Sequence, residues 1–89
     1  MRRNKRKFCF IICVHDEYVY EECLLYINRL NIPSGFTTEV LPIYKAKGMA
    51  EGYNKGMTGT DAKYKVYMHQ NVFITNPNFL NDVLTVFKQ

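Results

Sequence analysis

Hydrophobic residues gather in three short runs along the chain, and each run predicts a β-strand. The first run covers residues 8–14 and is apolar at every position, so both of its alternating faces would be buried. The second covers residues 37–43 and is rich in β-branched side chains. A third follows Thr60-Asp61-Ala62 and ends at about His69. Such continuous apolar runs are typical of parallel strands that helices cover.

Apolar residues at helical spacing separate and follow these runs and predict three helices. The first helix spans about residues 18–30, with acidic residues near its start, where the helix dipole favours them. Asn76-Pro77 is typical of a helix beginning and opens the last helix. The middle helix is short, and Gly56 and Gly59 weaken and stop it. Its inward stripe is Met49, Ala50, Tyr53 and Met57.

The resulting order, β-α-β-α-β-α, predicts a three-layer α/β fold with a small parallel sheet. If the first strand is central, the strand order is 2-1-3, as in a truncated Rossmann-like domain. We expect residues 8–89 to form this single domain and residues 1–7 to form a basic N-terminal arm.

Both histidines of the chain stand at the carboxyl ends of predicted strands. His15-Asp16-Glu17 follows the first strand, and His69-Gln70-Asn71 closes the third. Ligands of open α/β sheets bind at carboxyl ends where the strand order reverses, so we expect both segments to flank one crevice. The alternative interpretation is structural. Asp16 and Glu17 can cap the following helix and interact favourably with its dipole, and a histidine in a loop commonly forms a hydrogen bond with the backbone.

Charge and cysteine content narrow the possible functions. The chain has 89 residues and a formal net charge of +4, but the arm contributes five positive charges and the remainder is close to neutral. We therefore expect a solvated arm that can make weak contact with a membrane surface, and we do not expect nucleic-acid binding. No apolar run has membrane-spanning length, which favours a cytoplasmic protein. The three cysteines suit reduced, buried thiols, since no Cys-x-x-Cys pair indicates a zinc site.

Three segments together resemble a known family. They are residues 10–17 (FIICVHDE), 47–54 (KGMAEGYN) and 67–74 (YMHQNVFI). In this order they resemble the nucleotide-sugar-binding half of family-2-like glycosyltransferases of the GT-A fold. The greatest similarity is to a bacterial subgroup whose third strand ends in His-Gln-Asp-Val-Phe, where other members carry an Asp-x-Asp metal motif.

The resemblance implies a set of nucleotide-binding positions and a metal position. A lysine can meet a phosphate, and an asparagine offers both a donor and an acceptor. A divalent cation, Mg²⁺ or Mn²⁺, would sit against the diphosphate near position 71. The implied nucleotide-binding residues are Val14, His15, Asp16, Glu17, Lys47, Ala50, Tyr53, Asn54, His69 and Gln70.

The chain departs from the family in two ways. Asn71 replaces the metal-binding aspartate with an uncharged ligand. The family's acceptor-binding half and general base lie beyond this motif, and Asp82, the one later candidate, is expected on a helix surface. Two hypotheses follow. The chain is a truncated or degenerate glycosyltransferase-like domain that binds a nucleotide-diphosphate sugar, paired as a homodimer or with a missing catalytic half, or it is a non-catalytic dimeric interaction module.

Overall fold

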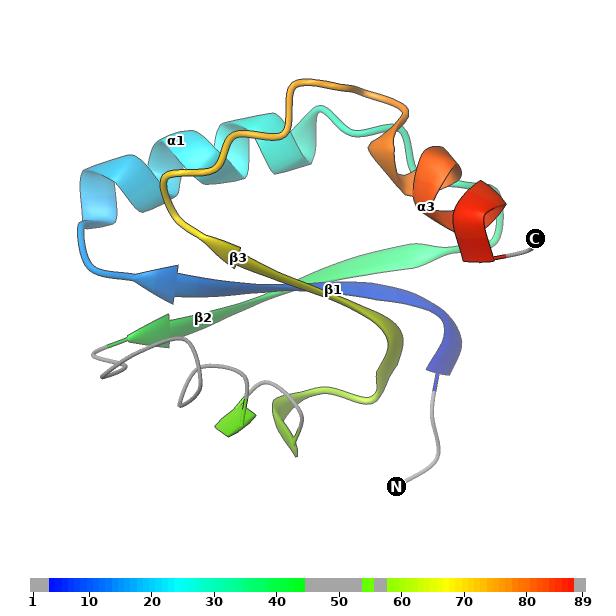
Figure 1. The fold of residues 1–89 in the computed structure, drawn as a ribbon, viewed down its shortest axis with the longest axis horizontal. Helices are drawn as coiled ribbons and strands as arrows, with labels where there is room; N and C mark the ends of the chain where they lie inside the picture. The colour runs from blue at the N-terminus through cyan, green and yellow to red at the C-terminus, as the bar shows by residue number, and fades with distance from the viewer. Residues whose placement is uncertain (1–3, 45–53, 56–57, 88–89) are drawn as a thin grey trace.

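In the described part of the chain, a three-stranded parallel sheet carries α1 and α3 on one of its faces (Figure 1). The structure is a computed structural model that describes residues 4–44, 54–55 and 58–87. Its elements in chain order are β1 (Asn4–Val14), α1 (Glu17–Asn28), β2 (Thr37–Tyr44), β3 (Ala62–His69) and α3 (Phe79–Phe87).

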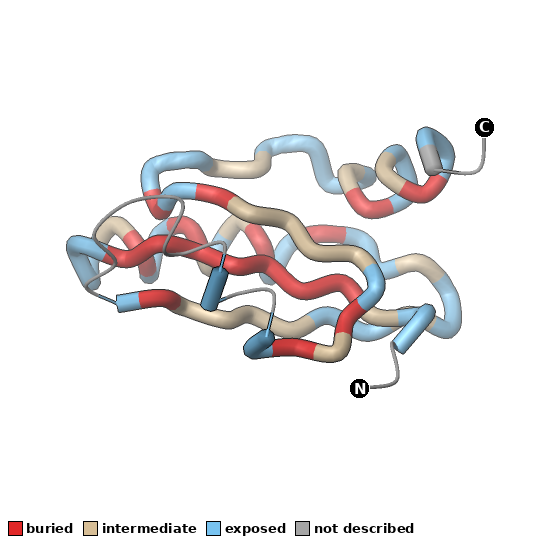
Figure 2. Tube along the Cα trace, turned by 60° about the horizontal axis from the view of Figure 1, so that its bottom comes forward, coloured by how far each residue is buried: buried red, intermediate tan, exposed pale blue. Residues whose placement is uncertain are grey.

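The first strand lies at the centre of the sheet, as the sequence predicts. The strand order is β2-β1-β3, and β1 pairs in parallel with both neighbours. Every residue from Phe8 to Val14 is buried, which explains the unbroken apolar run. Figure 2 shows this buried stretch running through the middle of the molecule. The 2-1-3 order and the α/β class are therefore confirmed.

The two faces of β1 contribute to two separate apolar clusters. Phe8, Phe10, Ile12 and Val14 face the helices and pack with α1 and α3 side chains such as Cys23 and Leu80. Cys9 and Ile11 face the other way and pack with Ile43, Ala62 and partly buried Leu41 and Tyr67. This division follows the alternation expected of a strand.

The second face of the sheet is approached by the segment that contains Gly59. A Cβ atom at Gly59 would lie 2.7 Å from Leu41 Cδ2, so only glycine allows this close packing without a shift of Leu41. Residues 54–55 and 58–59 are helical. The rest of the predicted middle helix, with Met49, Ala50 and Tyr53, lies outside the described residues, and so does most of the expected third layer.

Two element boundaries differ from the predicted ones. β1 begins at Asn4 rather than at the apolar run, because the Asn4 N–H donates to Asp61 O at 2.7 Å. Residues 4–7, expected in a solvated arm, therefore belong to the strand. α3 begins at Phe79, two residues after Pro77, because Asn76 closes a separate turn: its side-chain oxygen accepts the Asn78 N–H and its carbonyl accepts that of Phe79.

The three cysteines are free and buried, as predicted. Cys23 on α1 donates from its sulfur to Val72 O at 3.4 Å, which ties the helix to the segment after β3. Burial raises the pKa of the Cys9 thiol to about 11, so this group is an inert part of the core. No helix in the described part of the chain is long and apolar enough to cross a membrane.

Lys7 links β1 to β2 and to the residue that precedes β3, at the end of the sheet opposite the carboxyl ends of the strands. Its Nζ lies 2.9 Å from both Glu39 Oε2 and Asp61 Oδ1. The Thr60 hydroxyl donates to Glu39 Oε1 at 2.6 Å and accepts the Ala62 N–H. Hydrogen bonds from Thr60 and Lys7 lower the pKa of Glu39, and the two carboxylates raise that of Lys7.

We predict that Lys7→Met lowers the thermal midpoint at neutral pH, because the two carboxylates lose their shared cation. A carboxylate with a lowered pKa stabilises the fold above its ordinary pKa near 4.5, and this contribution disappears as the pH falls through the folded value. The difference in thermal midpoint between wild type and variant should therefore narrow on acidification below pH 4.5. Lys5→Met, on the exposed part of the strand, is the control and should show little change. An unchanging gap between pH 7 and pH 3 contradicts the prediction.

Candidate functional site

The carboxyl ends of the three strands meet at one edge of the sheet. Val14 at the end of β1 lies opposite Tyr44 at the end of β2, and Cys13 lies opposite His69 at the end of β3. The segments that follow β1 and β3 are therefore neighbours, as the parallel order predicts. His15 and His69 stand on the same edge of the molecule, and both are exposed.

Gln70 links these two segments through hydrogen bonds. Its side chain is buried, and its Oε1 atom accepts the backbone N–H groups of His15 at 2.7 Å and Asp16 at 2.9 Å. The Gln70 N–H in turn donates to Cys13 O at 3.3 Å. Gln70 is one of the predicted nucleotide-binding residues, and in the structure its side-chain oxygen positions the turn between β1 and α1.

Asp16 begins α1 as its N-cap. One carboxylate oxygen accepts the N–H groups of Tyr18 at 2.9 Å and Val19 at 3.4 Å, and the Asp16 carbonyl accepts that of Tyr20. With the two bonds to Gln70, four of the five backbone N–H groups of residues 15–19 donate within the chain. The beginning of α1 is thus satisfied internally and has few donors left for an anion.

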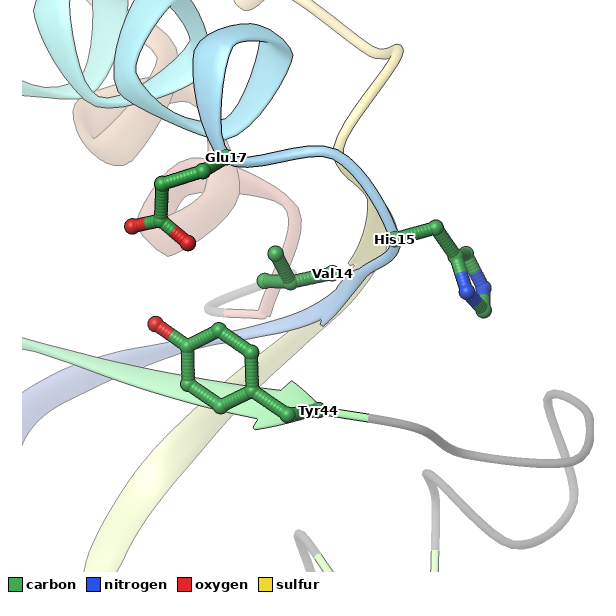
Figure 3. Close-up of a pocket in the computed structure, with 4 residues that line it drawn as sticks. All are labelled: Val14, His15, Glu17 and Tyr44. Atoms are coloured by element: carbon green, nitrogen blue, oxygen red, sulfur yellow. The ribbon is translucent and has the colours of Figure 1, made fainter.

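A hollow of about 360 Å³ opens beside this turn (Figure 3), a volume within the usual range of small-molecule sites. Val14, His15, Glu17 and Tyr44 line it. Figure 3 shows the side chains of Val14, Glu17 and Tyr44 gathered on one side of the turn, whereas the His15 imidazole points to the other side.

The predicted site residues omitted Tyr44. This residue ends β2, and its ring packs edge-on against Tyr20 with 6.4 Å between the ring centroids. Burial raises the pKa of Tyr20, and the adjacent Tyr44 and Glu17 raise it further. The sequence signal that could have identified Tyr44 is its place directly after the predicted strand of residues 37–43.

The remaining predicted nucleotide- and metal-binding residues lie at different positions in the fold. His69 lies exposed at the end of β3, and Asn71 lies in the turn in which the Val72 N–H donates to His69 O at 3.1 Å. Asn54 is exposed and helical. Lys47, Ala50 and Tyr53 lie outside the described residues. Of the predicted set, Val14, His15 and Glu17 line the hollow.

A divalent cation finds a poor set of ligands among the described residues. No group of three or more histidine, cysteine, aspartate or glutamate side chains gathers in that part of the chain. Asp16 uses one carboxylate oxygen to cap α1, and Asn71 offers only an amide oxygen. Mg²⁺ favours several oxygen ligands in octahedral geometry, which these residues do not assemble.

Fold and site together define a small α/β domain with a ligand-sized hollow at the carboxyl end of its central strand. A family model described as "Glycosyltransferase like family" matches residues 9–89, nearly the whole chain. The protein therefore belongs to this glycosyltransferase-like family. Searches of curated proteins and of solved structures gave no match.

We predict that Gln70→Ala destabilises the fold by about 1–3 kcal/mol, because it leaves the His15 and Asp16 N–H groups without their acceptor. Urea denaturation measures the change. Asn71→Ala, one residue further along and exposed, is the matched control and should stay within about 0.5 kcal/mol of wild type. Equal effects of the two substitutions contradict a positioning role for Gln70.

Proposed function

We propose that this domain binds a nucleoside diphosphate, as the donor half of an enzyme that transfers a sugar from a nucleotide-diphosphate sugar to an acceptor hydroxyl. The observation that carries the proposal is the hollow lined by Val14, His15, Glu17 and Tyr44 in a member of a glycosyltransferase-like family. Its place at the carboxyl end of the central strand is where open α/β sheets bind ligands. The cytoplasmic location expected from the sequence stays a prediction.

Side chains rather than backbone would hold the diphosphate. The N–H groups at the beginning of α1 already donate to Gln70 and Asp16, so this helix does not offer a usual phosphate site. The His15 imidazole lies at the boundary of the hollow and points away from Glu17, which places it on the side suited to an anion. In this proposal the nucleoside occupies the hollow and the diphosphate extends past His15.

The third strand supports the more specific subgroup assignment. Its tip reads His69-Gln70-Asn71-Val72-Phe73, which differs from His-Gln-Asp-Val-Phe at one position. The buried, doubly accepting Gln70 gives a structural reason for a glutamine in this pattern. Because Asn71 lacks a carboxylate, we propose that nucleotide binding by this chain is independent of a divalent cation.

Calorimetric titration with UDP, GDP, CDP and ADP tests the proposal. We expect at least one of them to bind and to raise the thermal midpoint, since a ligand at a hundred times its dissociation constant adds about 2.7 kcal/mol of stability. Tyr44→Ala should weaken this binding about tenfold or more. Tyr18→Ala, which removes a highly exposed tyrosine from α1 outside the hollow, should leave it unchanged. Failure of all four nucleotides to bind overturns the proposal.

Restoring the carboxylate tests the role of position 71. We predict that Asn71→Asp makes nucleotide binding about tenfold tighter in Mn²⁺ than in a chelator, because a carboxylate ligates a hard cation better than an amide does. Wild type should bind equally in both conditions. Titrations with and without Mn²⁺ on both proteins measure this difference, and a strong Mn²⁺ requirement of the wild type contradicts it.

The open edges of the sheet support a second candidate, a non-catalytic dimeric interaction module. Among the described residues, β2 and β3 each pair with a single strand, β1. Outer strands of this kind invite pairing with another chain. Sedimentation equilibrium tests this candidate: a stable dimer with no nucleotide binding favours the module, and a monomer that binds a nucleotide excludes it.

A further inference from the structure

We propose that the hollow selects guanine among the nucleobases, with Glu17 and Tyr44 reading its hydrogen-bonding edge. The inference rests on the proposed function, since it specifies which nucleotide the same site takes. It depends on two side chains that reach one space from different elements, Glu17 from the first residue of α1 and Tyr44 from the last residue of β2.

The structure positions the backbone of Glu17 and the ring of Tyr44. The backbone of Glu17 follows directly on the turn that Gln70 and Asp16 fix. The Tyr44 ring rests against buried Tyr20, and its residue is half exposed, so part of the ring remains available to a ligand. Figure 3 shows the Glu17 carboxylate and the Tyr44 hydroxyl end on the same side of Val14.

Glu17 is available to a ligand. Its carboxylate makes no hydrogen bond or ion pair with any residue in the described part of the chain. Its negative charge near the beginning of α1 interacts favourably with the helix dipole. This interaction does not by itself explain why the side chain lines the hollow. An exposed carboxylate with two free oxygens can accept two parallel N–H groups from one ligand.

Guanine is the base whose edge complements this pair. Along that edge it presents the O6 acceptor and then two adjacent donors, N1–H and the 2-amino group. A carboxylate accepts both donors, and a tyrosine hydroxyl donates to O6. Uracil presents a single donor between two carbonyl oxygens, which a carboxylate repels. Adenine and cytosine each present one amino donor beside an acceptor, so the second carboxylate oxygen would face a lone pair.

Titration of GDP, IDP and UDP into the wild-type chain measures this selectivity. IDP lacks only the 2-amino group, so it loses one charge-assisted hydrogen bond. We expect GDP to bind about tenfold or more tightly than IDP, and UDP to bind no better than IDP. Equal affinity for GDP and IDP overturns the inference, and so does tighter binding of UDP.

Variants of Glu17 assign the selectivity to its carboxylate. Glu17→Gln replaces one acceptor oxygen with a donor, so it should weaken GDP binding about tenfold without weakening UDP binding, which removes the preference for GDP over IDP. Glu22→Gln makes the same change of charge on an exposed part of α1 away from the hollow and should preserve the preference. A preference that survives in Glu17→Gln overturns the inference.

The ribose hydroxyls are the other donors that a carboxylate could accept, and 2′-deoxy-GDP separates the two. If Glu17 reads the base, 2′-deoxy-GDP binds as GDP does. The alternative outcome is that 2′-deoxy-GDP binds only as tightly as IDP and that Glu17→Gln weakens the binding of every nucleotide equally. In that case the carboxylate recognises the sugar, so the inference is wrong while the proposed nucleotide binding stands. Absence of binding by all these nucleotides overturns both the inference and the proposed function.

Discussion

The parallel pairing of β1 with strands on both sides is the constraint on which the rest of the structure depends. A strand with neighbours at both edges and apolar clusters on both faces has no exposed position for a polar side chain between Phe8 and Val14. The chain can place polar groups only where the strand ends. Because the neighbours run parallel, Val14, Tyr44 and His69 reach the same edge, and the candidate site forms there.

Much of this fold could be predicted because its signals are local. The apolar run at 8–14 indicates a strand buried on both sides, and the alternating β-α pattern predicts parallel pairing. The order 2-1-3 then follows from placing the most hydrophobic strand in the centre. The boundaries were less predictable. Hydrophobicity alone gave no reason to extend β1 to Asn4, where a backbone bond to Asp61 and the ion pairs of Lys7 hold a polar stretch in the sheet.

The candidate site could be predicted in location but only partly in composition. Val14, His15 and Glu17, which line the hollow, could be proposed from the sequence because Val14 ends the apolar run and the other two follow it closely. Tyr44 depended on the register of β2 against β1, which fixes where the second strand stops. For Gln70, the sequence shows a polar residue after the third strand, but only the packed structure reveals that its side-chain oxygen accepts two backbone N–H groups. Long-range hydrogen bonds of this kind leave no local pattern.

The internal satisfaction of the turn between β1 and α1 also constrains which part of a ligand this edge can recognise. A helix beginning with free N–H groups attracts phosphate, whereas here Gln70 and Asp16 occupy those groups and Glu17 adds a negative charge beside them. Phosphate is thereby disfavoured at the hollow itself, and groups rich in N–H donors are favoured. A nucleotide carries both kinds of group at opposite ends. This polarity orients the proposed ligand with its base toward Glu17 and Tyr44 and its diphosphate toward His15, whose imidazole points away from them.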